Sequence, residues 1–156
     1  MEKQDVIEKL ESYSRLMMRI TLLQNRLDVY DERSRAAPTA HLDGMPHGPG
    51  KSDRTADYAQ KIIDAINELN TIQDEAERAR ESVERFIDRI PQSKPPDIKA
   101  ALVLRSRFVE LMNWQEISSV IYGPDREGTE FESQLRQVYR WRDRGIQHLC
   151  KLKGER

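Results

Sequence analysis

The residues best suited to chemistry are four arginines in the stretch SQLRQVYRWRDRG, which runs from Ser133 to Gly145. They are Arg136, Arg140, Arg142 and Arg144, and two aromatic residues stand among them. A guanidinium group can pair bidentately with guanine or with a phosphate, and a glutamine amide can pair with adenine. The stretch can therefore be a solvated helix surface, a buried ion-pair cluster or a surface that contacts nucleic acid.

Helical periodicity divides these arginines between two faces. At about 100° per residue, the apolar side gathers Phe131, Leu135, Val138, Tyr139, Ile146 and Leu149. The opposite side carries Ser133, Arg136, Gln137, Arg140, Arg144 and Gln147. Arg142 points into the apolar side, so its charge needs a partner or must reach solvent, and Glu116 is one candidate partner.

The polar side favours an anionic ligand over a plain solvated surface. Arg136, Arg140 and Arg144 are one another's neighbours at i+4, where like charges repel by a few tenths of a kcal/mol. A bound anion would relieve that repulsion. A short helix, a turn and a basic helix also form the arrangement that places one helix in the major groove of DNA.

Three helices after residue 96 must position this face. The first is expected at 97–111, with Asp97 as its cap, and Asn113 caps a short helix, WQEISSVIY, which Gly123-Pro124 ends. Thr129 and Glu132 form a capping-box pattern that opens the last helix, at about 130–152. Gly145 costs that helix about 1 kcal/mol relative to alanine, which indicates a close helix–helix approach.

Two longer helices precede them. Apolar residues at helical spacing predict helices at 3–35 and 53–90, joined by a loop rich in glycine and proline at 36–52. Three prolines at 91–97 mark a domain boundary. The expected fold is all-α: residues 1–90 form a long antiparallel, coiled-coil-like hairpin for oligomerisation or partner contact, and residues 98–156 form a three-helix helix-turn-helix domain.

Composition fits helices and limits the class of protein. Of the 156 residues, 34% are charged and 37% hydrophobic, and the net charge is −1, so only local charge indicates an anionic partner. The segment 124–132 is acidic, whereas the residues after it are basic. There is one cysteine, no run of about 18 apolar residues and no signal peptide, so we expect a soluble cytoplasmic protein without membrane contact.

No constructed active site is evident, so we expect a protein that is not an enzyme and needs no cofactor. The sequence contains no phosphate-binding glycine loop after a strand, no nucleophile elbow and no metalloprotease motif. His41 and His47 share a loop with Asp43, but their spacing matches no zinc pattern and we expect no metal there.

Two strings resemble a known family. LVLRSRFVELMNWQEISSVIYG and LRQVYRWRDRGIQHLCKL resemble the region-4 helix-turn-helix of bacterial sigma factors and, more closely, phage and prophage late-transcription regulators of the ArpU/RinA type. The pattern covers Leu104 to Phe108, Trp114 to Ile117, Val138 to Trp141, and Gly145, Ile146 and Leu149. An acidic loop of nine residues replaces the family's tight turn, Arg142 stands where an apolar residue is usual, and Trp141 is large for its place.

The resemblance implies a DNA-binding transcriptional regulator of phage or prophage late genes. Bases would be read by Ser133, Arg136, Gln137 and Arg140, and phosphates contacted by Arg144, Lys151, Lys99 and Arg107. The motif core would be Phe108, Trp114, Ile117, Ile121, Val138, Gly145, Ile146 and Leu149. Its partners would be double-stranded DNA, and a second copy of the chain or RNA polymerase at the N-terminal helices.

Two other interpretations stay open. The chain could be a structural interaction protein, in which a coiled-coil scaffold carries a basic helix that pairs with an acidic protein. It could also be a phage DNA-packaging adaptor, since such adaptors combine a helix-turn-helix with helical oligomerisation regions. The steep salt dependence of DNA binding would distinguish the first of these from a DNA-binding regulator.

Overall fold

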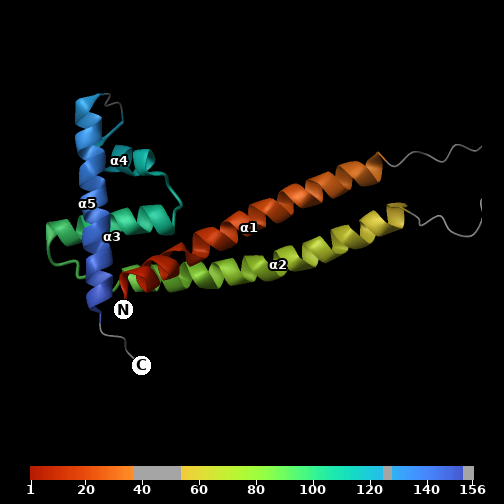
Figure 1. The fold of residues 1–156 in the computed structure, drawn as a ribbon, viewed down its shortest axis with the longest axis horizontal. Coiled ribbons are helices and arrows are strands. Elements are labelled where there is room, and N and C mark those ends of the chain that lie inside the picture. The colour runs from red at the N-terminus through yellow and green to blue at the C-terminus, as the bar shows by residue number, and fades with distance from the viewer. Residues whose placement is uncertain (37–53, 125–127, 153–156) are drawn as a thin grey trace, which may run out of the picture. The chain divides into compact units, whose positions relative to one another are not determined.

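The described part of the chain consists of helices joined by short connections. The computed structural model describes residues 1–36, 54–124 and 128–152, so most of the glycine- and proline-rich loop lies outside it. The helices are α1 (Lys3–Arg35), α2 (Arg54–Ile87), α3 (Pro95–Phe108), α4 (Trp114–Tyr122) and α5 (Thr129–Lys151) (Figure 1). Within these residues there is no strand, and the predicted all-α class is confirmed.

The chain divides into two compact units, but not at the proline-rich segment. The larger unit contains Met1–Arg15 and Ala76–Arg156, and the smaller unit contains Leu16–Glu75. Ile87 and Ile90, on either side of the end of α2, belong to the same buried cluster as Leu104 of α3 and Leu149 of α5. Residues 91–97 are therefore a connection inside the larger unit and not a domain boundary.

The smaller unit is formed by two antiparallel segments of α1 and α2 (Figure 1). Its buried residues are Ile20 and Leu23 from α1 and Ala65 and Ile72 from α2. Each helix also leaves large apolar side chains exposed in the described chain: Met18, Leu22 and Val29 on α1, and Ile63 and Ile66 on α2. Two helices alone cannot cover both of their apolar stripes, and this explains the exposure.

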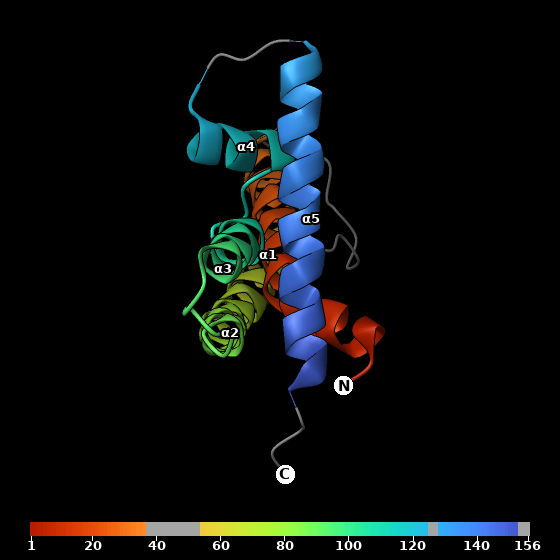
Figure 2. The ribbon, with the colours of Figure 1, turned by 90° about the vertical axis from the view of Figure 1, so that its left-hand side faces the viewer.

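The larger unit is held by two apolar clusters. The first joins Val6 and Leu10 of α1 to the end of α2, to α3 and to the C-terminal half of α5. The second joins Ala100 and Val103 of α3 to Ile117 of α4 and to the middle of α5. Figure 2 shows the result: α5 stands in front, with α3 and α4 beside different parts of its length. The two clusters thus fix α5 from Val138 onward.

The start of α3 differs from the expectation. Lys94 is the N-cap, its side chain makes no capping hydrogen bond, and Pro95 and Pro96 occupy the first two helical positions. Proline fits there because its missing N–H would have no helical partner and its φ angle is already helical. Asp97 is therefore the third residue of the helix, within its first turn, and its predicted capping role was wrong. The helix ends at Phe108 rather than at 111.

The predicted Asn113 cap of α4 is confirmed, and Glu116 completes a capping box that was not predicted. The Asn113 side chain accepts hydrogen bonds from the backbone N–H groups of Gln115 and Glu116, at 3.0 and 2.9 Å. The Glu116 carboxylate in turn accepts one from the Asn113 N–H, at 2.6 Å. This capping box satisfies donors that the first turn of a helix otherwise leaves without partners.

We expect Asn113→Ala to lower the free energy of unfolding by about 1 kcal/mol, the usual cost of losing such a cap. Urea unfolding followed by circular dichroism measures this change. Asn113→Asp keeps a capping acceptor and should remain within about 0.5 kcal/mol of the wild type. Equal losses in both variants would show that the cap is not what stabilises α4.

The start of α5 lacks the predicted capping box. The N-cap is Gly128, with a positive φ of 89°, and no side chain caps the helix. Glu132, which was expected to complete the box, instead lies 3.4 Å from the Arg136 guanidinium. Residues 125–127 of the acidic loop lie outside the described residues.

Candidate nucleic-acid interface

The four residues predicted to read bases lie together on the first half of α5. Ser133, Arg136, Gln137 and Arg140 all line one open surface pocket of about 430 Å³. The other lining residues are Glu130 and Gln134 of α5 and Tyr122 at the end of α4. The pocket therefore lies where a helix-turn-helix presents its second helix beside the end of its first.

The two arginines of this pocket keep their donors available. Arg136 is 3.4 Å from Glu132, and the two side chains are 74% and 68% exposed. An ion pair so exposed contributes about 0.5 kcal/mol or less, so a phosphate or base can replace it easily. Glu132 at i−4 was not anticipated as a partner for Arg136. Arg140 is exposed, and within the described residues its side chain makes only a long hydrogen bond, of 3.4 Å, to the Gln137 side chain.

Aromatic stacking fixes the wall of the pocket that α4 supplies. The rings of Tyr122 and Trp141 are stacked, with centroids 6.1 Å apart and an interplanar angle of 18°. Trp141 is buried, and the Lys99 ammonium lies 4.8 Å from the centroid of its ring. Burial raises the pKa of the Tyr122 phenol above its usual value, so this side chain stays a neutral hydrogen-bond donor at the edge of the pocket.

Arg144, which was predicted to contact phosphate, does not line this pocket. Its Nε donates to the Asp97 carboxylate at 2.6 Å, and His148 Nε2 lies 2.9 Å from the same oxygen. The Asp97 side chain is only 5% exposed. Asp97 is thus the anion that the charge of Arg144 requires, and the pair joins α3 to α5.

The contacts of Asp97 also shift its titration. The hydrogen bond from Arg144 is the main cause that lowers the pKa of Asp97, burial opposes it, and the hydrogen bond from His148 reinforces it. A carboxyl whose pKa is lower in the folded state adds stability above its unfolded pKa of about 3.9, and that stability is lost as the pH falls through the folded value.

We therefore expect Asp97→Asn to lower the midpoint of thermal unfolding at pH 7, because it removes the charge that Arg144 pairs with. The difference from the wild type should persist at pH 5 and shrink below pH about 4, where the wild-type carboxyl becomes protonated as well. Calorimetry across this range measures it. Asp74→Asn, at an exposed position on α2, is the control and should change little. A difference as large at pH 3 as at pH 7 would contradict the charge argument.

Arg142 has other partners than the expected Glu116. Its guanidinium donates twice to the Asp143 carboxylate, at 2.8 and 3.0 Å. It also lies over the rings of Trp114 and Tyr139, 5.6 and 5.2 Å from their centroids. Glu116 is engaged in the α4 capping box. Stacking on aromatic faces lets a guanidinium remain charged beside an apolar core, and this explains an arginine on that side of α5.

Three other residues were predicted to contact phosphate. Arg107 and Lys99 contact other side chains of the protein, whereas Lys151 is simply exposed. Arg107 donates to the Met112 carbonyl oxygen at 2.9 Å and lies 5.1 Å from the Trp114 ring centroid, so it holds the turn between α3 and α4. Lys99 covers Trp141, as described above. Lys151 is exposed in the last turn of α5. These lysines and this arginine do not line the pocket around Arg136 and Arg140.

The predicted motif core is largely buried. Phe108, Ile117, Val138, Gly145, Ile146 and Leu149 are buried, and Trp114 and Ile121 are half-buried. A Cβ atom added at Gly145 would lie 2.7 Å from Leu104 Cδ1 and 3.1 Å from Leu104 Cγ. The close helix–helix approach predicted at this glycine is therefore present, between α5 and α3.

No family model, curated protein or solved structure matches this chain. The functional interpretation therefore rests on the geometry of the site and on the residues that carry the family resemblance. In the described ranges, no helix is long and apolar enough to cross a membrane. The same part of the chain contains no group of three metal-ligating side chains, and His41, Asp43 and His47 lie outside it.

Tyr122, Glu130 and Gln134 line the pocket but were not anticipated from the sequence. Gln134 follows Ser133 and falls on the buried side of the helix, where its side chain is 8% exposed. Tyr122 ends α4, its ring stacks on Trp141, and it lines the pocket. The sequence signal that could have placed Tyr122 at the pocket was its possible pairing with Trp141, 19 residues further along the chain. No local spacing rule connects two residues so far apart.

Proposed function

We propose that this chain binds double-stranded DNA through the surface of Ser133, Arg136, Gln137 and Arg140, and that it regulates transcription of phage or prophage late genes. The observation that carries the proposal is the gathering of these four side chains in one open pocket on the first half of α5. Arginine and glutamine are the side chains that pair bidentately with guanine and adenine in the major groove. The likeness to ArpU/RinA-type regulators supports the link to late transcription.

The docking that this surface supports is that of a helix-turn-helix. The first half of α5 would enter the major groove, and α4 would cross the phosphate backbone. The two apolar clusters of the larger unit hold α5 against α3 and α4. Such a rigid frame fixes which bases the side chains of α5 can reach, and this is what sequence discrimination requires.

A second copy of the chain is the partner that the smaller unit fits. Met18, Leu22, Ile63 and Ile66 are exposed apolar side chains on its two helices, and pairing with another hairpin would cover them. A dimer would place two α5 helices on a two-fold DNA site. The same exposed side chains also favour the alternative of a structural interaction protein, in which self-association is the main function.

DNA-site selection with the purified protein, read by sequencing, tests the proposal. We expect enrichment of a short motif, with a two-fold repeat if the protein binds as a dimer. A flat, sequence-independent profile would rule out a sequence-specific regulator. Footprinting on a phage genome would then separate two kinds of DNA-binding protein, because a regulator protects the region upstream of late genes and an adaptor protects a packaging site.

A further inference from the structure

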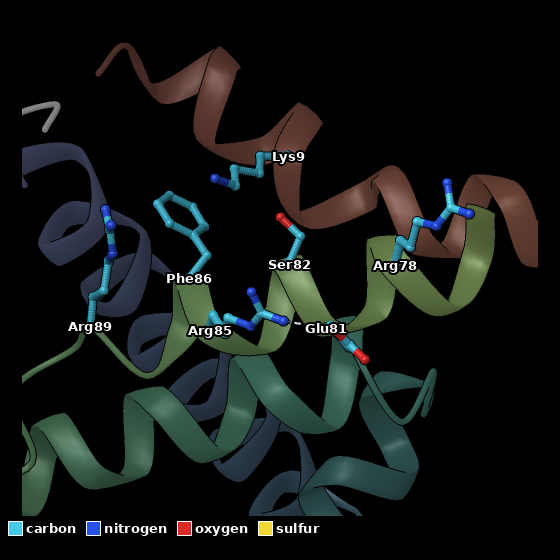
Figure 3. Close-up of a pocket in the computed structure, with 7 residues that line it drawn as sticks. All are labelled: Lys9, Arg78, Glu81, Ser82, Arg85, Phe86 and Arg89. Carbon is cyan, nitrogen blue, oxygen red and sulfur yellow. Dashed lines mark hydrogen bonds and ion pairs between the residues drawn. The ribbon is translucent and has the colours of Figure 1, made fainter. Parts of the chain in front are cut away.

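A second basic surface lies within the larger unit, on α1 and the last turns of α2 (Figure 3). It surrounds an open pocket of about 380 Å³. Lys9 of α1 contributes one side, and the other lining residues all lie between Arg78 and Arg89. Nothing in the family resemblance or in the α5 site accounts for it.

Three arginines and a serine line this surface. Arg78, Ser82 and Arg85 follow one another on α2 at steps of four and three residues, the spacing that places side chains on one face of a helix. Arg89 lies in the turn just after α2, which ends at Ile87, and all four residues line the pocket. At 1.5 Å per residue, Arg78 and Arg85 are about 10 Å apart along the helix. We call these four residues the α2 arginine row.

The charges of Lys9, Arg78 and Arg85 on this surface are little neutralised in the described chain. The Lys9 ammonium lies 4.5 Å from the centroid of the Phe86 ring, an aromatic and not an anionic partner. Arg78 pairs with no carboxylate in the described chain. Arg85 is 2.6 Å from Glu81, but these side chains are 78% and 57% exposed. A pair so exposed contributes little stability, so an incoming anion can displace Glu81.

The length of the row indicates the class of ligand. A single phosphate or small carboxylate is too small to reach cations spread over about 10 Å or more. A nucleic-acid strand carries one phosphate per about 3.4 Å of helix axis and can meet several of them at once. The one ring in the pocket, Phe86, is buried and covered by Lys9, so no aromatic surface is left for a base to stack on.

We propose that the α2 arginine row and Lys9 bind the phosphodiester backbone of DNA without reading its sequence. The site is separate from the α5 pocket, because it adjoins the cluster around Ile146 and Leu149, whereas the α5 pocket adjoins α4. The proposal for this surface does not depend on whether α5 reads bases. A protein with two such surfaces can contact DNA beyond the bases that α5 reads.

The test is titration of a labelled random-sequence duplex with the full chain at several salt concentrations. Arg78→Glu should weaken binding about five- to tenfold at 0.1 M salt and lower the slope of log affinity against log salt by about one, as expected for one lost phosphate contact. Arg80→Glu is the matched control. It changes the charge equally, two residues along α2, but about 160° round the helix, and it should leave both quantities near those of the wild type. Circular dichroism checks that both variants fold.

Each outcome decides the proposal. Equal effects of Arg78→Glu and Arg80→Glu would overturn it, and so would a wild-type chain that does not bind the random duplex at 0.05 M salt. Displacement of DNA by a polyglutamate peptide at a far lower concentration than by unlabelled duplex would assign the row to an acidic protein instead. An Arg136→Ala/Arg140→Ala variant that still binds random DNA in an Arg78-dependent way would support the row, whether or not α5 reads bases. Random-DNA binding by that variant that does not depend on Arg78 would overturn the row.

Discussion

Replacing Arg136 and Arg140 together by alanine is expected to abolish specific DNA binding. A good bidentate contact to a base discriminates by about 1–3 kcal/mol, so losing two should cost about 2–6 kcal/mol, or roughly 30-fold to 10⁴-fold in affinity. The structure adds a reason for so large a loss. The one ion pair of these side chains, with Glu132, is exposed and contributes too little to offset the lost contacts. Titration of the selected DNA site at fixed salt measures the effect.

The matched control is Arg26→Ala/Arg33→Ala. Both arginines are exposed on α1 in the smaller unit, so this variant loses the same charge and no part of the α5 surface. It should bind the selected site within about threefold of the wild type. If both double variants lose affinity equally, net charge and not the α5 pocket would account for binding, and the assignment of base-reading residues would be wrong.

Arg144 shows why a row of arginines on a helix wheel is not yet a binding surface. The sequence places it with Arg136 and Arg140 at regular spacing. Its partner Asp97 stands 47 residues away and is buried. No local pattern connects them, because the pairing depends on how α3 crosses α5. Arg144→Gln should therefore act on stability and much less on DNA affinity.

The features that could be predicted are those that local rules determine. Periodicity over 33 residues gave α1 from Lys3 to Arg35, and the Asn113 box follows from four adjacent residues. The start of α3 was misplaced because Asp97 is a good cap by type, but two prolines before it already suit the first turn. The division into units was missed because the buried contacts of Ile87 and Ile90 are made with residues far away in the chain.

The orientation of α5 depends on Gly145, and Gly145→Val is expected to be among the most destabilising substitutions in the chain. A Cβ at this position would lie 2.7 Å from Leu104 Cδ1, and Leu104 is fully buried, so its side chain has no solvent to move into. Overpacking by added methyl groups costs about 1–3 kcal/mol. Valine adds three carbons, and the better helix propensity of a residue other than glycine returns less than about 1 kcal/mol. We expect a loss of about 3 kcal/mol in urea unfolding.

A double-mutant cycle identifies the cause of that loss. Leu104→Ala alone should cost about 2–5 kcal/mol through the cavity it leaves. In Gly145→Val/Leu104→Ala the valine methyls occupy that cavity, so the double variant should be more stable than the sum of the single losses by about 1–3 kcal/mol. Leu10→Ala is the matched control, because Leu10 is as fully buried in the same cluster but is not among the nearest neighbours of Gly145. Its losses should add to those of Gly145→Val within about 0.5 kcal/mol. If the Leu104 cycle is equally additive, the crossing of α3 and α5 does not require a glycine, and another contact must set the orientation of the α5 surface.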